Sequence, residues 1–348
     1  MLSRFASNAS LAKTRALFSR RLTRSDYTTL SEQKDVGQVA AYLRGHPGYA
    51  DVLAGIDETR IHRAELEFLL RQKHFSSLES LCRFEVSLGE AFVNYILLSG
   101  EITLLLDAMT RIQSAAGAAQ SPNIPPYMRR HIRIDTDALA AASNFGELVE
   151  AARGSVFYGE LKKLPAAGTQ SLMEFEIALY RGFYSDIVEL ADKKIGGKAG
   201  ALLRRIVVSE IDLMNLIRLI RLRVYFEADD EYIRRALLPF GTMRARTVSR
   251  LLACKTEEEI LSVAAKCGYE KPLRLLSGCA LRDDLTQKFL FEMAMHNIRF
   301  SPYPPIVMVS YLRILSVEIT NIIRIIEGIR YGIAPAEIQS MLVLSAKE

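Results

Sequence analysis

The sequence predicts an all-α protein, and three observations lead to that prediction. Prolines leave two spans of more than seventy residues free for long helices, one between Pro47 and Pro122 and one between Pro165 and Pro239. Inside these spans apolar residues recur every three or four positions, as they do over 202–220. Sustained alternation with a period of two, which would indicate strands, is not found.

Composition limits the classes of protein that fit. The 348 residues are 49% hydrophobic and 24% charged, which is ample material for a buried core. The net charge is only +5, and basic and acidic residues are interspersed, which argues against a nucleic-acid partner. No apolar run reaches about eighteen residues without a charge, so we expect no transmembrane helix and, at most, peripheral contact with a membrane.

The first 24 residues contain six basic side chains and no acidic one. That composition is typical of a mitochondrial transit peptide. However, Phe5, Leu11, Leu17 and Leu22 recur at roughly helical spacing, and this pattern favours a structural first helix over a targeting segment.

A tyrosine recurs at nearly constant spacing along the chain. Tyr49, Tyr158 and Tyr269 are separated by 109 and 111 residues, and each follows a glycine that we expect to end a helix in left-handed geometry. These glycines are Gly45, Gly154 and Gly268. The tyrosines are therefore predicted to be structural repeat positions, packed back on the preceding helix.

A second repeat has nearly the same period. The segment DLMNLIRLIR at 212–221 aligns without a gap to EITNIIRIIE at 318–327, an offset of 106 residues. A degenerate first copy, AFVNYILLSG, places Asn94 in register with Asn215 and Asn321 but lacks the acid and the arginine. The two repeats predict three helical units, over 1–121, 122–228 and 229–348.

Polar residues in the last two copies step by three along the helix, and we call each set a polar ladder. Its acid, asparagine and arginine are Asp212, Asn215 and Arg218 in one copy, and Glu318, Asn321 and Arg324 in the other. One interpretation is hydrogen bonding that locks helices within a unit. The other is a cavity facing a partner, with partner contacts at Arg218, Arg221, Arg324 and Arg330. Capping of these arginines by acids of their own unit would indicate packing.

Signatures of catalysis and metal binding are weak. Gly196-Gly197-Lys198 resembles the end of a phosphate-binding loop, but Ala199 stands where Ser or Thr is required, so an inter-helix loop is expected. The pairs Glu58/His62 and Glu292/His296 are interpreted as surface ion pairs on helices, and the run 229–231 as helix-start charges. The four cysteines have no metal-ligand spacing and are expected to be reduced. We therefore predict no enzyme, catalytic residue, cofactor, metal or small-molecule substrate.

The quoted repeats, the opening FASNASLAKTRALFSRRLTRSDYTTL and the closing SYLRILSVEITNIIRIIEGIRYGIAPAEIQSMLV resemble the C-subunit family of the V-type ATPases of archaea and bacteria, which is related to the d subunit of the eukaryotic vacuolar ATPase. The most specific part is the last ladder, followed by a Gly-Ile-x-Pro turn at 332–335 and a short helix.

The resemblance implies a non-catalytic rotor component of a rotary ATPase. Its implied form is a funnel of three similar helical units around a pseudo-threefold axis, on the cytoplasmic face of the membrane. Its implied partners are the central shaft subunits and the proteolipid ring that carries H⁺ or Na⁺. The alternative is an all-α helical-repeat scaffold that binds a peptide or nucleic acid in a concave face. A third class, an all-α metal or isoprenoid enzyme, is disfavoured because its carboxylate motifs are missing.

Overall fold

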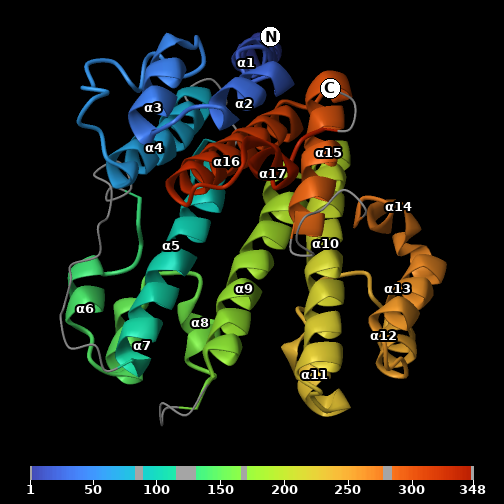
Figure 1. Ribbon diagram of the computed structural model, residues 1–348. Coiled ribbons are helices and arrows are strands. Elements are labelled where there is room, and N and C mark those ends of the chain that lie inside the picture. The colour runs from blue at the N-terminus through green and yellow to red at the C-terminus, as the bar shows by residue number, and fades with distance from the viewer. Residues whose placement is uncertain (1, 83–88, 115–130, 166–170, 277–283, 346–348) are drawn as a thin grey trace. The chain divides into compact units, whose positions relative to one another are not determined.

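The computed structural model describes every residue except 1, 83–88, 115–130, 166–170, 277–283 and 346–348, and it leaves out the side chains of 2–7, 82 and 89–97. Within the described residues all regular elements are helices, and no strand occurs there (Figure 1). The prediction of an all-α fold is confirmed.

The chain folds into two compact units. Unit 1 combines the two ends of the chain, Met1–Gly89 and Glu270–Glu348, and unit 2 is the continuous stretch Glu90–Tyr269. The three-unit division at 121 and 228 remains a prediction.

Unit 1 is organised around one long helix, α16 (Pro304–Arg330). The remaining helices of unit 1 are α1 (Leu2–Phe18), α2 (Arg24–Ser31), α3 (Val36–Gly45), α4 (Arg63–Cys82), α14 (Glu270–Leu273), α15 (Asp284–Phe300) and α17 (Pro335–Ser340). Helices α1, α2, α3, α4, α15 and α17, which come from both segments of unit 1, pack against α16.

Helix α16 is also the one described helix that is long and apolar enough to span a membrane. Its most apolar window is 72% buried inside the protein, as expected for a core helix. Pro304 and Pro305 occupy its first turn, where the missing N–H of proline costs nothing.

The basic N-terminal segment forms α1, which packs on α16 and α4. Nζ of Lys13 donates to Oγ of Ser80 at 2.7 Å, and the Arg15 guanidinium donates to the backbone carbonyls of Ile298 and Ser301, each at 3.0 Å. This geometry agrees with a structural first helix.

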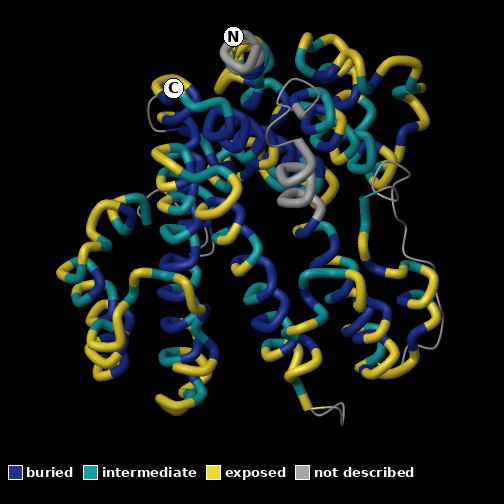
Figure 2. Tube along the Cα trace, turned by 180° about the vertical axis from the view of Figure 1, so that it is seen from behind, coloured by how far each residue is buried: buried dark blue, intermediate teal, exposed yellow. Residues whose placement is uncertain are grey.

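Unit 2 contains three long helices with short helices beside them. The long helices are α5 (Gly89–Gln113, from Glu90 on), α9 (Leu172–Glu189) and α10 (Gly197–Ile220). The short ones are α6 (Thr136–Ala141), α7 (Phe145–Ala151), α8 (Tyr158–Leu161), α11 (Asp230–Ala236), α12 (Ala245–Leu252) and α13 (Glu257–Ala264). Buried and exposed faces alternate along most helices of the chain (Figure 2).

Side-chain caps fix where several helices begin. Thr23 with Asp26, Ser171 with Glu174, and Thr256 with Glu259 form capping boxes that satisfy the free N–H groups of α2, α9 and α13. Asp229 caps α11, so the acidic run at 229–231 is a helix start, as predicted.

Gly196 makes a sharp junction before α10. A π-helical turn over Leu190–Ile195 ends at this residue, whose φ of 61° suits glycine, and α10 begins at the next position. The Gly196-Gly197-Lys198 segment is thus an inter-helix junction, as the sequence indicated.

Candidate functional site: polar ladders, the Glu318 cavity and exposed helix ends

The two asparagines of the ladders make the same pair of buried hydrogen bonds. Asn215 donates to the backbone carbonyl of Leu238 at 2.9 Å and accepts from its N–H at 2.8 Å. Asn321 does the same with Val343, at 2.9 and 3.0 Å. Each asparagine side chain therefore pairs with both backbone groups of one residue, as another backbone segment would. These bonds attach the segment around Leu238 to α10 and the segment around Val343 to α16.

The ladder arginines are used inside their own units. Arg218 donates to the carbonyl of Ala236 at 3.2 Å and to Oε1 of Glu176 at 3.3 Å. Arg324 donates to the carbonyl of Met341 at 2.8 Å and to Oδ1 of Asp284 at 2.6 Å.

Each arginine thus binds the C-terminal carbonyls of a short helix and an acid of a third segment. This is the arrangement that indicates packing, and it favours that interpretation for Arg218 and Arg324 over contact with a partner.

The acids that begin the ladders bind backbone N–H groups of a following segment. Asp212 accepts from the N–H groups of Thr242 and Met243, at 2.8 and 3.2 Å, and from the Thr242 hydroxyl at 2.5 Å. Gly241 lies against this carboxylate so closely that a Cβ would overlap Oδ1 of Asp212. Tyr269 lies near Asp212, and the pKa of its hydroxyl is raised first by burial and then by the negative charge of this carboxylate.

Glu318 repeats this arrangement with the opposite end of the chain. Its Oε2 accepts from the N–H of Leu22 at 2.8 Å, and its Oε1 accepts from the Tyr49 hydroxyl at 2.5 Å. Leu22 directly precedes the cap of α2, just as Thr242 shortly precedes α12. The ladder of α16 is therefore completed by residues almost three hundred positions earlier.

Glu101 holds the equivalent contact in the first copy. Its Oε1 accepts from the N–H of Arg133 at 2.8 Å, shortly before α6. Glu101 precedes Asp212 by 111 residues, so the register places Leu104, rather than Asn94, at the asparagine position. The side chain of Asn94 lies outside the described residues.

The three repeat tyrosines are not equivalent. Tyr49 is fully buried, whereas Tyr158 and Tyr269 are partly exposed, and the Tyr158 hydroxyl binds Glu150 at 3.2 Å rather than Glu101.

Only Gly268 has the left-handed geometry expected of the preceding glycines, with φ of 105°. The expectation is wrong for Gly45, which is the last residue of α3. It is also wrong for Gly154, which is required because a Cβ there would lie 2.7 Å from the carbonyl of Arg133.

Burial dominates the electrostatics of Glu318. Desolvation raises the pKa of this carboxyl to about 7, although the Tyr49 hydroxyl, the Leu22 N–H, Lys73 and Arg21 all favour the charged form. The pKa of Tyr49 is raised as well, first by burial and then by the negative charge of Glu318. A proton is therefore held near neutrality at the point where the two ends of the chain meet.

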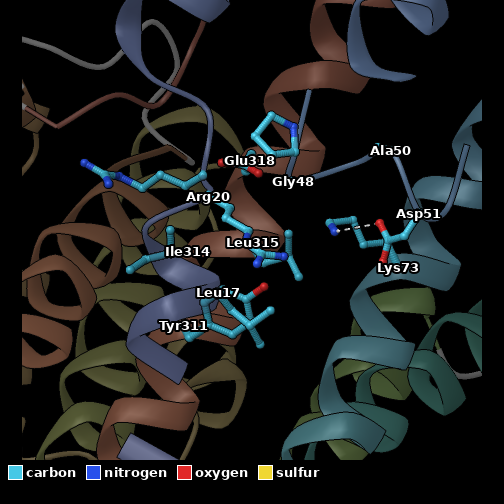
Figure 3. Close-up of a pocket in the computed structure, with 12 residues that line it drawn as sticks. Leu17, Arg20, Gly48, Ala50, Asp51, Lys73, Tyr311, Ile314, Leu315 and Glu318 are labelled. Carbon is cyan, nitrogen blue, oxygen red and sulfur yellow. Dashed lines mark ion pairs between the residues drawn. The ribbon is translucent and has the colours of Figure 1, made fainter. Parts of the chain in front are cut away.

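Glu318 borders a cavity of about 210 Å³ within unit 1, shown in Figure 3. The wall is formed by the end of α1 and the residues after it, the turn at 47–51, Lys73 of α4 and one face of α16. The charged side chains in this wall are Arg20, Arg21, Asp51, Lys73 and Glu318.

The Glu/His pairs show no sign of a metal site. Glu58 lies outside any helix and pairs with Arg44 at 2.7 Å, so the prediction of a helical Glu58/His62 ion pair is wrong. His296 on α15 contacts the Phe300 ring, with centroids 4.9 Å apart. Among the described residues no group of three potential metal ligands occurs.

The exposed ends of the ladder helices were missed by sequence reasoning. Tyr225 is 63% exposed in the π-helical turn Arg221–Tyr225 after α10, and Tyr331 is 74% exposed directly after α16. Tyr225 and Tyr331 are 106 residues apart, and the two ladders are offset by the same number of residues. This shared spacing is the sequence signal that could have identified the two tyrosines. The predicted partner residues Arg221 and Arg330 lie beside them and are exposed.

Comparison with known proteins places these features in a family. A family model described as ATP synthase (C/AC39) subunit matches residues 11–341. The chain is also similar to the C subunit of an A-type ATP synthase from Pyrococcus abyssi (strain GE5 / Orsay), 23% identical over 218 residues. That alignment covers 59% of this chain and 56% of the relative, so the chain spans little more than half the length of the curated relative it matches.

Proposed function

Because the chain belongs to the ATP synthase (C/AC39) subunit family of rotary ATPases, we propose that it is a non-catalytic adapter of the central stalk. In this role it couples rotation of the central shaft to the proteolipid ring during ATP-linked H⁺ or Na⁺ transport. The observation that carries the proposal is the family match over nearly the whole chain. The adapter is peripheral, on the cytoplasmic face of the membrane, and its partners are the shaft subunits and the ring.

The internal bonding suits a part that transmits force. In each ladder the acid and the asparagine bind backbone groups, and the arginine binds both a backbone carbonyl and an acid of another helix, so the long helix cannot slide without breaking several hydrogen bonds at once. Such cross-bonding stiffens a helical protein without any ligand chemistry. The funnel with a pseudo-threefold axis is part of this proposal.

We assign shaft or ring contacts to the exposed helix ends rather than to the ladder arginines. Arg221 with Tyr225 and Arg330 with Tyr331 combine an arginine and a tyrosine, two residue types that are enriched at protein interfaces. Arg218 and Arg324 already have carboxylate partners, so they have less to offer to another protein.

The test is size-exclusion chromatography of this protein mixed with the shaft subunits of its own organism. The proposal requires a complex of equal stoichiometry. Replacement of Arg330 and Tyr331 together by alanine should weaken the complex about tenfold or more, as expected for interface hot spots. Arg60→Ala, at an exposed arginine of the same unit, is the matched control and should bind as wild type does.

Three outcomes would count against the proposal. Separate elution of the protein and the shaft subunits would contradict a stalk adapter. Binding to nucleic acid that falls steeply with salt would favour the helical-repeat scaffold instead. If a folded Arg324→Ala protein loses shaft binding while variants at Arg330 and Tyr331 still bind, the shaft contact lies at the ladder arginine and not at the exposed helix end.

A further inference from the structure

The cavity beside Glu318 is lined by the cations Arg20, Arg21 and Lys73 and by the acids Asp51 and Glu318, and two of the cations, Arg20 and Lys73, are poorly compensated. The Lys73 side chain is only 11% exposed, and its nearest carboxylate is that of Asp51, 3.9 Å away and 82% exposed. An ion pair of that length with a solvated partner is weak. The Lys73 ammonium also lies 4.9 Å from the Tyr49 ring centroid, and burial lowers its pKa. This cation is costly to bury and poorly compensated.

Arg20 lines the same cavity, and its guanidinium makes no hydrogen bond or ion pair within the described part of the chain. Its charge reaches Lys73, since it is one of the groups that lower the pKa of that lysine. Arg21 is a third cation in the wall and stacks on the Phe18 ring at 4.3 Å. Like charges brought together in one hollow repel each other unless an anion lies between them.

The two acids in the wall do not neutralise this charge. Both oxygens of Glu318 are already occupied, by the Tyr49 hydroxyl and the Leu22 N–H, and the pKa of about 7 leaves this group partly protonated near neutrality. Asp51 is largely exposed and pairs with Lys73 (Figure 3). The balance of the cavity is therefore positive.

We propose that this cavity binds a phosphate group, held by Arg20 and Lys73. Two cations match the charge of a phosphate monoester, and both the planar guanidinium of arginine and the compact ammonium of lysine are groups that proteins use to bind phosphate. A volume of about 210 Å³ leaves room for the phosphate and a small substituent. Inorganic phosphate and a phosphomonoester lipid headgroup share this chemistry. The site does not depend on the proposed function.

The experiment is calorimetric titration of the full-length protein with inorganic phosphate at constant ionic strength, with chloride as the counter-titration. A second arm measures cosedimentation with phosphatidylcholine vesicles that contain or lack phosphatidic acid. Binding in the first arm identifies a soluble phosphate as a ligand, and binding only to phosphatidic acid identifies a lipid headgroup.

Arg20→Gln and Lys73→Met should each weaken binding about tenfold or more, because each removes a charge-assisted hydrogen bond. Arg60→Gln, which removes an exposed arginine outside the cavity, should leave binding unchanged. Arg20 is exposed, so its variant tests the site even if the Lys73 variant fails to fold. No binding in either arm, or equal weakening by Arg60→Gln, would overturn the proposal.

Discussion

Replacement of Glu318 by glutamine should make the stability of unit 1 less dependent on pH. The carboxyl has a pKa of about 7 in the folded protein, against an ordinary value of 4.5. The folded state therefore holds this proton more tightly than the unfolded state does. Its contribution to stability is fully present below pH 4.5 and is lost as pH rises through 7. Between pH 5 and 8 the loss amounts to about 2.5 kcal/mol.

Glutamine imitates the protonated acid at this position. Its carbonyl can accept from the Leu22 N–H, and its amide can donate to the Tyr49 hydroxyl, so both contacts are kept. The variant should equal wild type within about 1 kcal/mol at pH 5 and exceed it by about 2 kcal/mol at pH 8.

The measurement is urea unfolding, followed by far-ultraviolet circular dichroism, at four pH values from 5 to 8. With a slope of about 2 kcal/mol per molar urea, the midpoint of the variant should shift by about 1 M relative to wild type across this range. Glu337→Gln, at an exposed acid on α17 of the same unit, is the control and should parallel wild type. A difference between wild type and Glu318→Gln that stays constant with pH would refute the reasoning.

Three further predictions test neighbouring contacts. His74 donates to the Leu312 carbonyl, and burial lowers its pKa to about 4. The stability that neutral His74 contributes is therefore present above pH 6.5 and is lost as pH falls through 4, so wild type should lose about 2 kcal/mol of unfolding free energy between pH 8 and 5. His74→Gln should abolish this loss in the same urea unfolding series. Asn321→Ala leaves the N–H and carbonyl of Val343 unpaired and should lower the free energy of unfolding by about 2–3 kcal/mol, measured by urea unfolding. An equal loss in Asn94→Ala would contradict the alignment of Glu101 with Asp212, which places Leu104 at the asparagine position. Gly241→Ala should cost about 2 kcal/mol through its clash with Asp212 in thermal unfolding, and Gly159→Ala, where a Cβ meets nothing within 4 Å, should be neutral.

The pKa values of Glu318 and His74 are shifted in opposite directions, so their effects on the pH dependence of stability oppose each other. This decides which comparison the first experiment needs. Both groups lie in unit 1, and each changes stability by about 2 kcal/mol over the same pH range. One contribution falls with rising pH while the other grows, so wild type alone can look nearly independent of pH. Only the difference between a variant and wild type isolates either group.

Local pattern was enough to predict the helices and the ladders. The three-residue step in 212–218 and 318–324 identified the polar ladders, and Asn215 and Asn321 make the same backbone bonds in the two copies. Capping residues such as Thr256 likewise mark their helix start in the sequence. The pattern could not say whether Arg218 and Arg324 face inward, because the acids that bind them, Glu176 and Asp284, lie about forty residues upstream on other helices.

The degenerate first copy misled the register for a physical reason. In 91–97 only an asparagine matched, and one asparagine on an apolar helix is not a specific signal. The structural counterpart of Asp212 is Glu101, whose role depends on the N–H of Arg133 in a separate segment. Such a contact leaves no mark at a fixed short spacing.

The ladder acids Asp212 and Glu318 are matched with different copies of the tyrosine segment. Tyr269 follows Asp212 by 57 residues and lies close enough for the carboxylate charge to raise the pKa of its hydroxyl, after burial. Glu318 binds the tyrosine of the first copy instead, since it accepts from the Tyr49 hydroxyl and from the Leu22 N–H. Unit 2 thus contains the contacts of Glu101 and Asp212, while unit 1 forms the contact of Glu318 from segments that are far apart in the sequence. Because burial raises the pKa of Glu318 to about 7, this contact makes the packing of those segments depend on protonation near neutral pH.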